Sequence, residues 1–216
     1  APGVVRTDRP VTLRELVSTA ALRTHGLTSG TLSVGISLPP DLQSWRSRPF
    51  MARLQLSAPG GGVLDRAKSR VSVTLNGTYL HSYPLVPWSL NPFRTPGAPV
   101  EHNLELPVWK MAQHNELRLY FDVHPRHMTD AAAAASDAVV ELDPSSTIDF
   151  SKSRHFAVLP DVAMFASAAF PFSRMADLSE TTVLLPPRPN SATVGAFVDM
   201  MGFVGAITRY PATGVD

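Results

Sequence analysis

Apolar and polar residues alternate with a period of two through most of the first two thirds of the chain. Such alternation sends one set of side chains into a core and the other into solvent, so it predicts half-buried β-strands. The clearest runs span residues 32–38, 50–57, 71–75, 78–85 and 117–124. Weaker runs lie at residues 11–13, 102–106 and 139–142. Asn76-Gly77 joins two of the clear runs and predicts a β-hairpin, because both positions of a type I′ turn need positive φ.

Few helices compete with these strands. Thr12–Ala21 is the early helix candidate, and Ala131–Ala135 predicts a flexible loop or a single helical turn. Loops rich in proline and glycine separate the strands, for example residues 58–62 and 91–99. About eight antiparallel strands with polar outer faces are typical of a two-layer sandwich and suit a jelly roll. The alternation pattern by itself also allows a barrel.

The pattern of apolar and polar residues changes near the C-terminus. Thr181–Leu185 predicts a short buried strand, and Ser191 predicts the N-cap of an amphipathic helix that Pro211 ends. Strand, loop and helix form the first half of a β-α-β crossover. The second strand is expected near Gly214-Val215, where the chain stops. We therefore expect a truncated α/β domain in a piece of a longer protein.

The stretch Ser145–Pro187 is rich in Phe, Ala, Leu, Val and Pro and has no clean period over most of its length. An apolar run outside a regular element indicates packing between two bodies. We expect a sandwich domain at 1–145, a packed junction at 146–180 and an incomplete α/β (flavodoxin-like) domain at 181–216. His155 is expected to bond a backbone carbonyl there. The junction phenylalanines are predicted to lock the two bodies together: Phe150, Phe156, Phe165, Phe170 and Phe172.

Composition narrows the function classes. The 216 residues are 44% hydrophobic and 17% charged, with a formal net charge of +1 and no dense Lys/Arg run, so nothing favours a nucleic-acid partner. The absence of cysteine excludes disulfides, thiolate metal sites and cysteine nucleophiles. No run reaches the roughly 18 apolar residues of a membrane span. Because the chain starts at Ala1-Pro2-Gly3 without Met or a signal sequence, any anchor is expected outside it.

A series of segments, in order along the chain, carries a family resemblance. They are Ser69–Gly77, Asn115–Pro125, Ser146–Phe150, His155–Pro160, Phe170–Phe172, Ala176–Thr181 and Met201–Ala212. Together they resemble the periplasmic B subunit of bacterial cellulose synthase over most of residues 66–212, whereas the first 60 residues match only in texture. In that family, jelly-roll carbohydrate-binding-like domains alternate twice with small α/β domains before a membrane-anchoring helix. The chain departs from it in lacking the anchor and in the segment Ala131–Ala138.

The resemblance implies the second jelly roll and the start of the second α/β domain of a non-catalytic subunit. Such a subunit supports the membrane glucosyltransferase and guides the nascent β-1,4-glucan across the periplasm. Its implied partners are the catalytic subunit of cellulose synthase, nascent cellulose in transient contact and further copies of the B subunit. The implied location is the periplasm, tethered to the inner membrane through a C-terminal anchor outside this chain. The family is also labelled as binding cyclic di-GMP, but this chain lacks the Arg-rich motif that usually holds that dinucleotide, and no cofactor is expected.

Glucan recognition needs flat, partly exposed aromatic rings, because the C–H face of a pyranose is its only large apolar surface. Trp45 lies among polar residues, and Tyr120 lies on the polar face of its predicted strand, two residues from Arg118. The alternative is that these rings close loops over the ends of the sandwich. The full set of candidate glucan contacts is Trp45, Trp88, Trp109, Tyr79, Tyr83, Tyr120 and Arg118.

Catalytic and metal signatures are weak. His124 and His127 resemble a two-histidine metal pair, but without a third ligand a loop with solvated imidazoles is expected. There is no Gly-x-Ser-x-Gly elbow, and Gly60–Gly62 lacks the Lys-Ser/Thr of a phosphate loop. No catalytic or metal-binding residue is assigned. Two alternatives stay open: a stand-alone β-glucan-binding module, and a glycoside hydrolase whose paired carboxylates need only meet in space.

Overall fold

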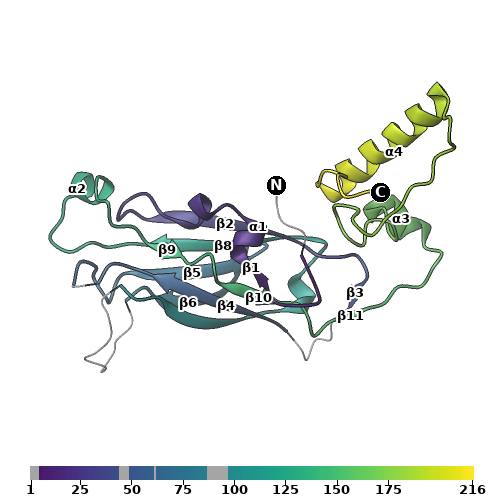
Figure 1. Ribbon diagram of the computed structural model, residues 1–216. Helices are drawn as coiled ribbons and strands as arrows, with labels where there is room; N and C mark the ends of the chain where they lie inside the picture. Colours follow the sequence, from purple (N-terminus) through teal and green to yellow (C-terminus); the bar gives the residue numbers. More distant parts are fainter. Residues whose placement is uncertain (1–4, 44–48, 61, 87–96) are drawn as a thin grey trace.

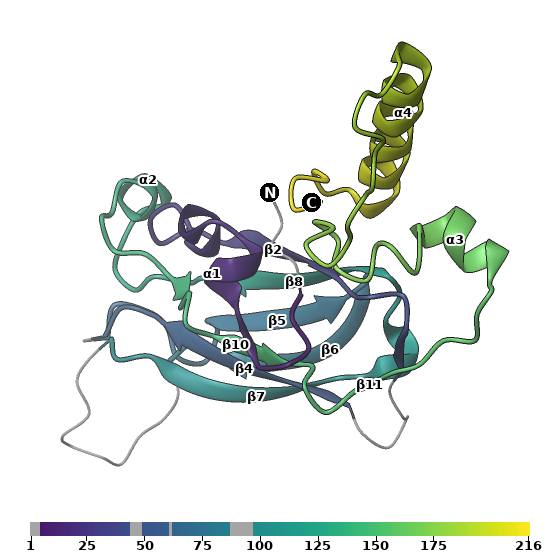
Figure 2. The ribbon, with the colours of Figure 1, turned by 45° about the vertical axis from the view of Figure 1, so that its right-hand side comes forward.

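The computed structural model describes residues 5–43, 49–60, 62–86 and 97–216. Two antiparallel sheets lie face to face, and a helical C-terminal part lies beyond one end of them (Figures 1 and 2). The predicted mainly β architecture is therefore confirmed.

Most strands belong to these two sheets. The first sheet contains, in spatial order, β1 (Val11–Thr12), β10 (Thr147–Asp149), β4 (Phe50–Ser57) and β7 (Val100–Leu106), with β9 (Glu141–Leu142) paired to the end of β4. The second sheet contains β2 (Gly30–Ser37), β8 (His114–Asp122), β5 (Arg70–Leu75) and β6 (Thr78–Pro84). A separate short pair joins β3 (Leu42–Gln43) to β11 (Arg154–His155).

The strand pairs form one nested set. β5 pairs with β6, β4 pairs with β7, β2 pairs with β8, and β1 pairs with β10. Such a nested hairpin has a first arm and a second arm. When it folds over once into a jelly roll, strands of the first arm alternate with strands of the second arm in each sheet. Both sheets show this alternation. The jelly-roll prediction is confirmed, and the strands of the described residues form two separate main sheets instead of one closed barrel.

The core forms from the inward positions that the alternation predicts. Leu54 on β4, Val71 on β5 and Leu119 on β8 are fully buried, whereas their strand neighbours face solvent. The turn between β5 and β6 has φ of 50° at Asn76 and 78° at Gly77, as a type I′ turn requires. Period-two patterning and turn chemistry together explain why these residues form this sandwich.

The early helix candidate becomes two short pieces, α1 (Leu13–Leu16) and a 3-10 turn, η1 (Thr19–Leu22). Their leucines are buried in the sandwich core, so the segment covers the core instead of extending as one helix. The alanine tract forms one helical turn, α2 (Asp130–Ala134). A second 3-10 turn, η2 (Val108–Lys110), follows β7.

The C-terminal part contains α3 (Val162–Ala168) and α4 (Ser191–Thr208), which contact each other. The N-cap of α4 is Asn190, one residue before the predicted Ser191, because the Asn190 side chain accepts a hydrogen bond from the backbone of Thr193. Sequence pattern alone often misplaces a helix end by a residue.

The predicted strand at Thr181–Leu185 is not assigned as a strand in the structure. The backbone of this segment instead forms two hydrogen bonds with Asp216. The Val183 N–H donates to the Asp216 carbonyl at 2.7 Å, and the Asp216 N–H donates to the Thr181 carbonyl at 3.2 Å. This is the hydrogen-bond pattern of a parallel bridge. The predicted strand before α4 is therefore replaced by a single pair of hydrogen bonds between the segments on either side of the helix.

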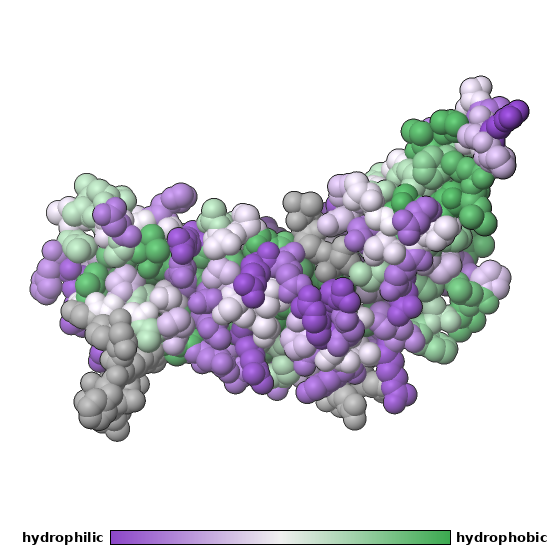
Figure 3. All heavy atoms as spheres, in the orientation of Figure 1, coloured by the Kyte–Doolittle hydropathy of each residue, from purple (hydrophilic) through white to green (hydrophobic). Residues whose placement is uncertain are grey.

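The amphipathic prediction for α4 was wrong. Val204 and Thr208 are its buried residues, while Val194, Val198 and Phe203 are exposed, so apolar groups point both inward and outward. Hydrophobic atoms gather over α3 and α4, in contrast to the polar surface of the sandwich (Figure 3). By length and composition the 18 residues of α4, with a mean hydropathy of 1.4, would suffice to cross a membrane. The sequence prediction of no continuous apolar span still holds for these residues, because Ser191, Thr193 and Asp199 interrupt the run, and only the average hydropathy over the helix is high.

Candidate functional site

The outer face of the second sheet presents two cross-strand rows of small hydroxyl and aromatic side chains. One row contains Thr31, Tyr120, Ser72 and Ser82, and the next contains Ser33, Arg118, Thr74 and Tyr79. On β2, β5 and β8 these positions alternate with buried ones, and Ser82 and Tyr79 of β6 pair with Ser72 and Thr74, so the eight side chains lie on the solvent side of the sheet. We call these eight residues the hydroxyl–tyrosine face. It extends across all four strands of the sheet.

Two tyrosine rings rise from this face. Tyr120 is 48% exposed and Tyr79 is 60% exposed. They lie two strands apart and one row apart, which places their Cα atoms about 12 Å from each other. Two separated platforms of this kind suit successive stacking contacts with one chain. The predicted pair of Tyr120 and Arg118 is therefore on a common exposed surface, and Tyr79 joins it across β5.

A charged pair lies at one end of this face, where Glu116 occupies the row next to Arg118. Glu116 accepts from the Arg118 guanidinium at 2.8 Å and from the Ser33 hydroxyl at 2.6 Å. The hydrogen bond from Arg118, followed by the one from Ser33, lowers the pKa of Glu116. The carboxylate in turn raises the pKa of Arg118. The guanidinium is thus held over the sheet with its remaining donors free to meet hydroxyl oxygens.

A groove of about 710 Å³ lies where the edge strands β6 and β7 approach each other. We call it the edge groove. Its walls include the predicted Trp109 and Tyr83. Trp109 stands on η2 and is 59% exposed. The remaining wall residues are Pro49, Leu80, His81, Asn103, Leu104, Glu105 and Pro107.

Three rings that are tilted against one another pack in a row at the edge groove. His81 and Tyr83 have ring centroids 4.4 Å apart, and Tyr83 and His102 have centroids 4.3 Å apart. The Tyr83 hydroxyl donates to the Asn103 carbonyl at 2.9 Å and so links the two sheets at their edges. Burial raises the pKa of Tyr83. Burial, and then repulsion by His81, lowers the pKa of His102, so its imidazole favours the neutral form.

The other candidate residues fall into separate places. Trp45 and Trp88 lie outside the described residues. The edge groove and the hydroxyl–tyrosine face share no residue. The structure thus places Tyr120, Arg118 and Tyr79 on the hydroxyl–tyrosine face. It places Tyr83 and Trp109 in the edge groove. Whether any of them contacts a glucan stays a prediction.

Sequence reasoning did not single out Ser33, Ser72 and Thr74, or the edge-groove residues His81 and Glu105. The hydroxyl residues acquire meaning only from strand register, which places them beside the tyrosines. The sequence pattern predicts only that these residues face solvent, and it predicts the same for any polar residue of an alternating strand.

The junction phenylalanines occupy different environments. Phe150 is fully buried in the sandwich core, 4.9 Å from Phe50 in an edge-to-face pair. Phe170 is buried. Phe165 faces Phe172 and the helix residue Phe203 at ring distances of 6.3 and 6.0 Å. Phe156 is exposed. A common locking role for the five stays a prediction.

His155 bonds differently from the expectation. Its Nδ1 lies 3.0 Å from the buried Asp41 carboxylate, and its Nε2 lies 2.7 Å from the Thr7 hydroxyl. The predicted backbone carbonyl partner is therefore replaced by two side chains, because β11 pairs with β3 and brings the imidazole beside the loop that holds Asp41. This contact ties the N-terminal segment to the residues that follow the sandwich.

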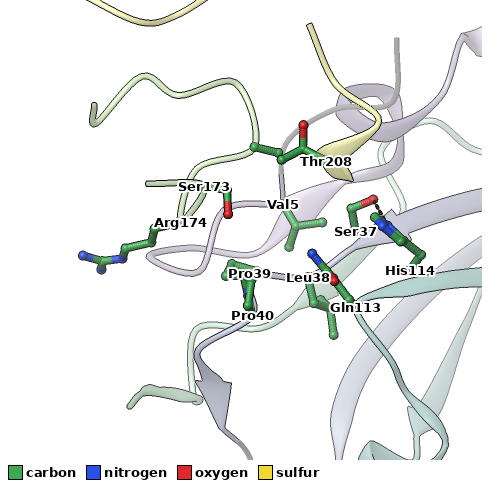
Figure 4. Close-up of a pocket in the computed structure, with 11 residues that line it drawn as sticks. Val5, Ser37, Leu38, Pro39, Pro40, Gln113, His114, Ser173, Arg174 and Thr208 are labelled. Carbon is green, nitrogen blue, oxygen red and sulfur yellow. Dashed lines mark hydrogen bonds between the residues drawn. The ribbon is translucent and has the colours of Figure 1, made fainter. Parts of the chain in front are cut away.

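A second polar contact lies where α4 ends near the sandwich. His114 is 3.2 Å from the Ser37 hydroxyl and also hydrogen-bonds the backbone of Ile207. Thr208 and Ser173 approach the same small pocket from the C-terminal part, and Arg174 points away from it (Figure 4). Burial, and then Arg209, lowers the pKa of His114. The pocket holds about 20 Å³, too little for more than water.

Metal coordination finds no support in the part of the chain that the structure describes. It contains no group of three or more His, Asp or Glu side chains placed to hold an ion. His124 lies 2.9 Å from the Asp122 carboxylate, and His127 is exposed with φ of 55°.

Comparison with known proteins gives two adjoining family matches. Residues 10–147 match the model described as cellulose synthase BcsB, second CBM domain, and residues 155–216 match cellulose synthase BcsB, second FD domain. The first match alone covers more than half of the chain.

Individual relatives agree with these matches. The chain is 46% identical to putative cellulose synthase 2 of Komagataeibacter xylinus over its whole length, but it spans only 15% of that protein. It is 41% identical to a cyclic di-GMP-binding protein of the same species, again over its whole length, and spans 28% of that protein. Among solved structures, a family 35 carbohydrate binding module from an environmental isolate matches with a TM-score of 0.37 and 12% identity, over 73% of this chain and 89% of the module.

Proposed function

The chain belongs to the cellulose synthase BcsB family, and we propose that it is a non-catalytic part of a cellulose synthase accessory subunit that contacts the β-1,4-glucan product. The observation that carries the proposal is the family match of residues 10–147, which falls on a jelly roll with an exposed hydroxyl–tyrosine face. The proposed partner is the membrane glucosyltransferase subunit. The proposed location is the periplasmic side of the inner membrane.

The chemistry of the hydroxyl–tyrosine face suits guidance better than capture. Tyr79 and Tyr120 offer two separated apolar platforms, and serine and threonine hydroxyls around them exchange hydrogen bonds with a polyol as readily as with water. The face is open, so little polymer surface is removed from solvent on contact. A chain can therefore touch this surface and move on.

The test is polymer synthesis by inner-membrane vesicles that contain the whole synthase. A double variant, Tyr79→Ala with Tyr120→Ala, removes both platforms, and Tyr79→Phe with Tyr120→Phe keeps the rings as the matched control. We expect the Ala pair to lower incorporation of glucose from UDP-glucose into insoluble polymer several-fold at unchanged subunit level, while the Phe pair retains it. Wild-type synthesis by the Ala pair would exclude this face as a polymer contact.

A second candidate function is a binding module that retains β-glucan, favoured by the description of the matched family as a CBM domain. It differs from guidance in affinity. Calorimetry of the chain with cellohexaose separates the two: guidance predicts millimolar or weaker binding, whereas retention predicts dissociation constants of about 10 µM or below.

A further inference from the structure

The edge groove has the composition of a site for a ring with one apolar and one polar side. Trp109 presents an exposed indole, and Leu80, Pro49 and Pro107 add apolar wall. Its volume of about 710 Å³ lies within the range typical of small-molecule sites. Nothing in the described chain fills this space, and the indole is the largest apolar group that borders it.

Backbone groups supply the polar side of the edge groove. The Asn103 carbonyl accepts from Tyr83, which lies on β6, so this carbonyl points away from the partner strand β4. In an antiparallel strand the N–H and C=O of one residue point to the same side, and the side alternates along the strand. Asn103 and Glu105 therefore turn their backbone groups toward the edge groove. The Asn103 carbonyl keeps one lone pair beside its bond from Tyr83, and edge backbone groups that have no partner strand are ready hydrogen-bond partners.

The charges around the edge groove select a neutral ligand. Among its described wall residues there is no lysine or arginine, and the one carboxylate is Glu105. His102, stacked behind Tyr83, has its Nε2 buried without a hydrogen-bond partner, and its lowered pKa keeps it neutral. A phosphate or a uronic acid would meet no lysine or arginine among the described wall residues and would face the Glu105 carboxylate. A hydroxyl-rich neutral ring meets donors and acceptors only.

We propose that the edge groove is a second glucan-binding site, in which a pyranose ring of a neutral β-glucan stacks on Trp109 and its hydroxyls bond the free edge of β7. This inference rests on the proposed function, since it names a second contact for the same polymer. The site lies at the open edge of the sandwich and shares no residue with the hydroxyl–tyrosine face. A polymer passing over the sandwich thus has one flat contact and one recessed contact.

The experiment is a titration of the isotope-labelled whole chain with cellohexaose, followed by amide and indole NMR signals. We expect shifts at Asn103, Glu105 and the Trp109 indole. Trp109→Ala should weaken the binding that is measured at the Asn103 and Glu105 signals by up to about tenfold, as the loss of one stacking contact implies. Trp109→Phe keeps a ring and should lose less, and Tyr79→Ala should change the affinity at these signals by less than about twofold.

Each outcome decides a separate point. Shifts confined to the hydroxyl–tyrosine face, with Trp109→Ala without effect, would overturn the edge groove and leave the proposed function standing. Inorganic phosphate that saturates the same edge-groove signals at lower concentration would overturn the neutral ligand class. No shift at Asn103, Glu105 or the Trp109 indole would also overturn the edge groove, and the vesicle assay with the tyrosine variants then judges the proposed function independently.

Discussion

Replacing Phe150 with alanine should destabilise the chain far more than replacing its neighbour Phe156. Phe150 is fully buried and packs edge-to-face on Phe50 at 4.9 Å, whereas Phe156 is 64% exposed. Truncation of a fully buried phenylalanine costs about 3–5 kcal/mol, through lost burial and the cavity left behind. Truncation of an exposed one stays within about 0.5 kcal/mol. A loss of about 4 kcal/mol is a large part of the 5–15 kcal/mol that holds a typical domain folded.

The assay is urea unfolding followed by circular dichroism. With a slope of about 2 kcal/mol per molar urea, Phe150→Ala should lower the midpoint by about 2 M, and Phe156→Ala should leave it almost unchanged. Phe150→Leu keeps most of the volume and should lie between the two, which preserves the comparison if the alanine variant does not fold. Equal midpoint shifts for Phe150→Ala and Phe156→Ala would refute the assignment of Phe150 to the sandwich core.

Three further results are expected. Gly26→Ala should cost about 2 kcal/mol or more in thermal unfolding, because Gly26 has φ of +62° and an added Cβ would lie 2.6 Å from a carbonyl oxygen of α2; a change below about 0.5 kcal/mol would contradict this. The hydrogen bonds from Arg9 lower the pKa of Glu15 to about 2, so the advantage of wild type over Glu15→Gln should be complete above about pH 4.5, stay below about 1 kcal/mol, and fade as the pH drops toward 2; a constant difference between pH 7 and 2.5 would exclude it. His155→Ala should cost about 1–3 kcal/mol in urea unfolding, because it leaves the buried Asp41 carboxylate without its ring donor, and an unchanged midpoint would argue against that bond.

The sandwich was predictable because its signals are local. Leu54, Val71 and Leu119 belong to alternating runs, and burial of one face fixes which residues point inward. Asn76-Gly77 fixes a hairpin for reasons of backbone conformation alone. The resemblance and the pattern also agree on a jelly roll.

Strand partners and surfaces were not predictable in the same way. The alternation within its own strand predicts that Tyr120 faces outward. It does not predict the neighbours Thr31 and Ser72, because they come from strands that are distant in sequence. The edge groove depends on two edge strands from different sheets, with Trp109 on the turn that follows one of them. Residues that meet only through long-range pairing leave no periodic trace in the sequence.

The helix α4 shows a second limit. Its helical spacing and its end were readable, but the direction of its apolar side chains was not, because Val194 and Val198 are exposed while Val204 is buried. A periodic pattern identifies a helix and says less about what covers it.

The junction shows that apolar composition does not tell how a segment is fastened. Phe156 and Phe172 are exposed, while His155 in the same stretch reaches Asp41 and Thr7, and His114 reaches the end of α4. A hydrogen bond adds only about 0.5–1.5 kcal/mol net, but it requires a defined direction and distance. Apolar contacts add more free energy and tolerate more orientations. We therefore expect these two histidines to help define how the C-terminal part meets the sandwich, because each one bonds partners from two different segments of the chain.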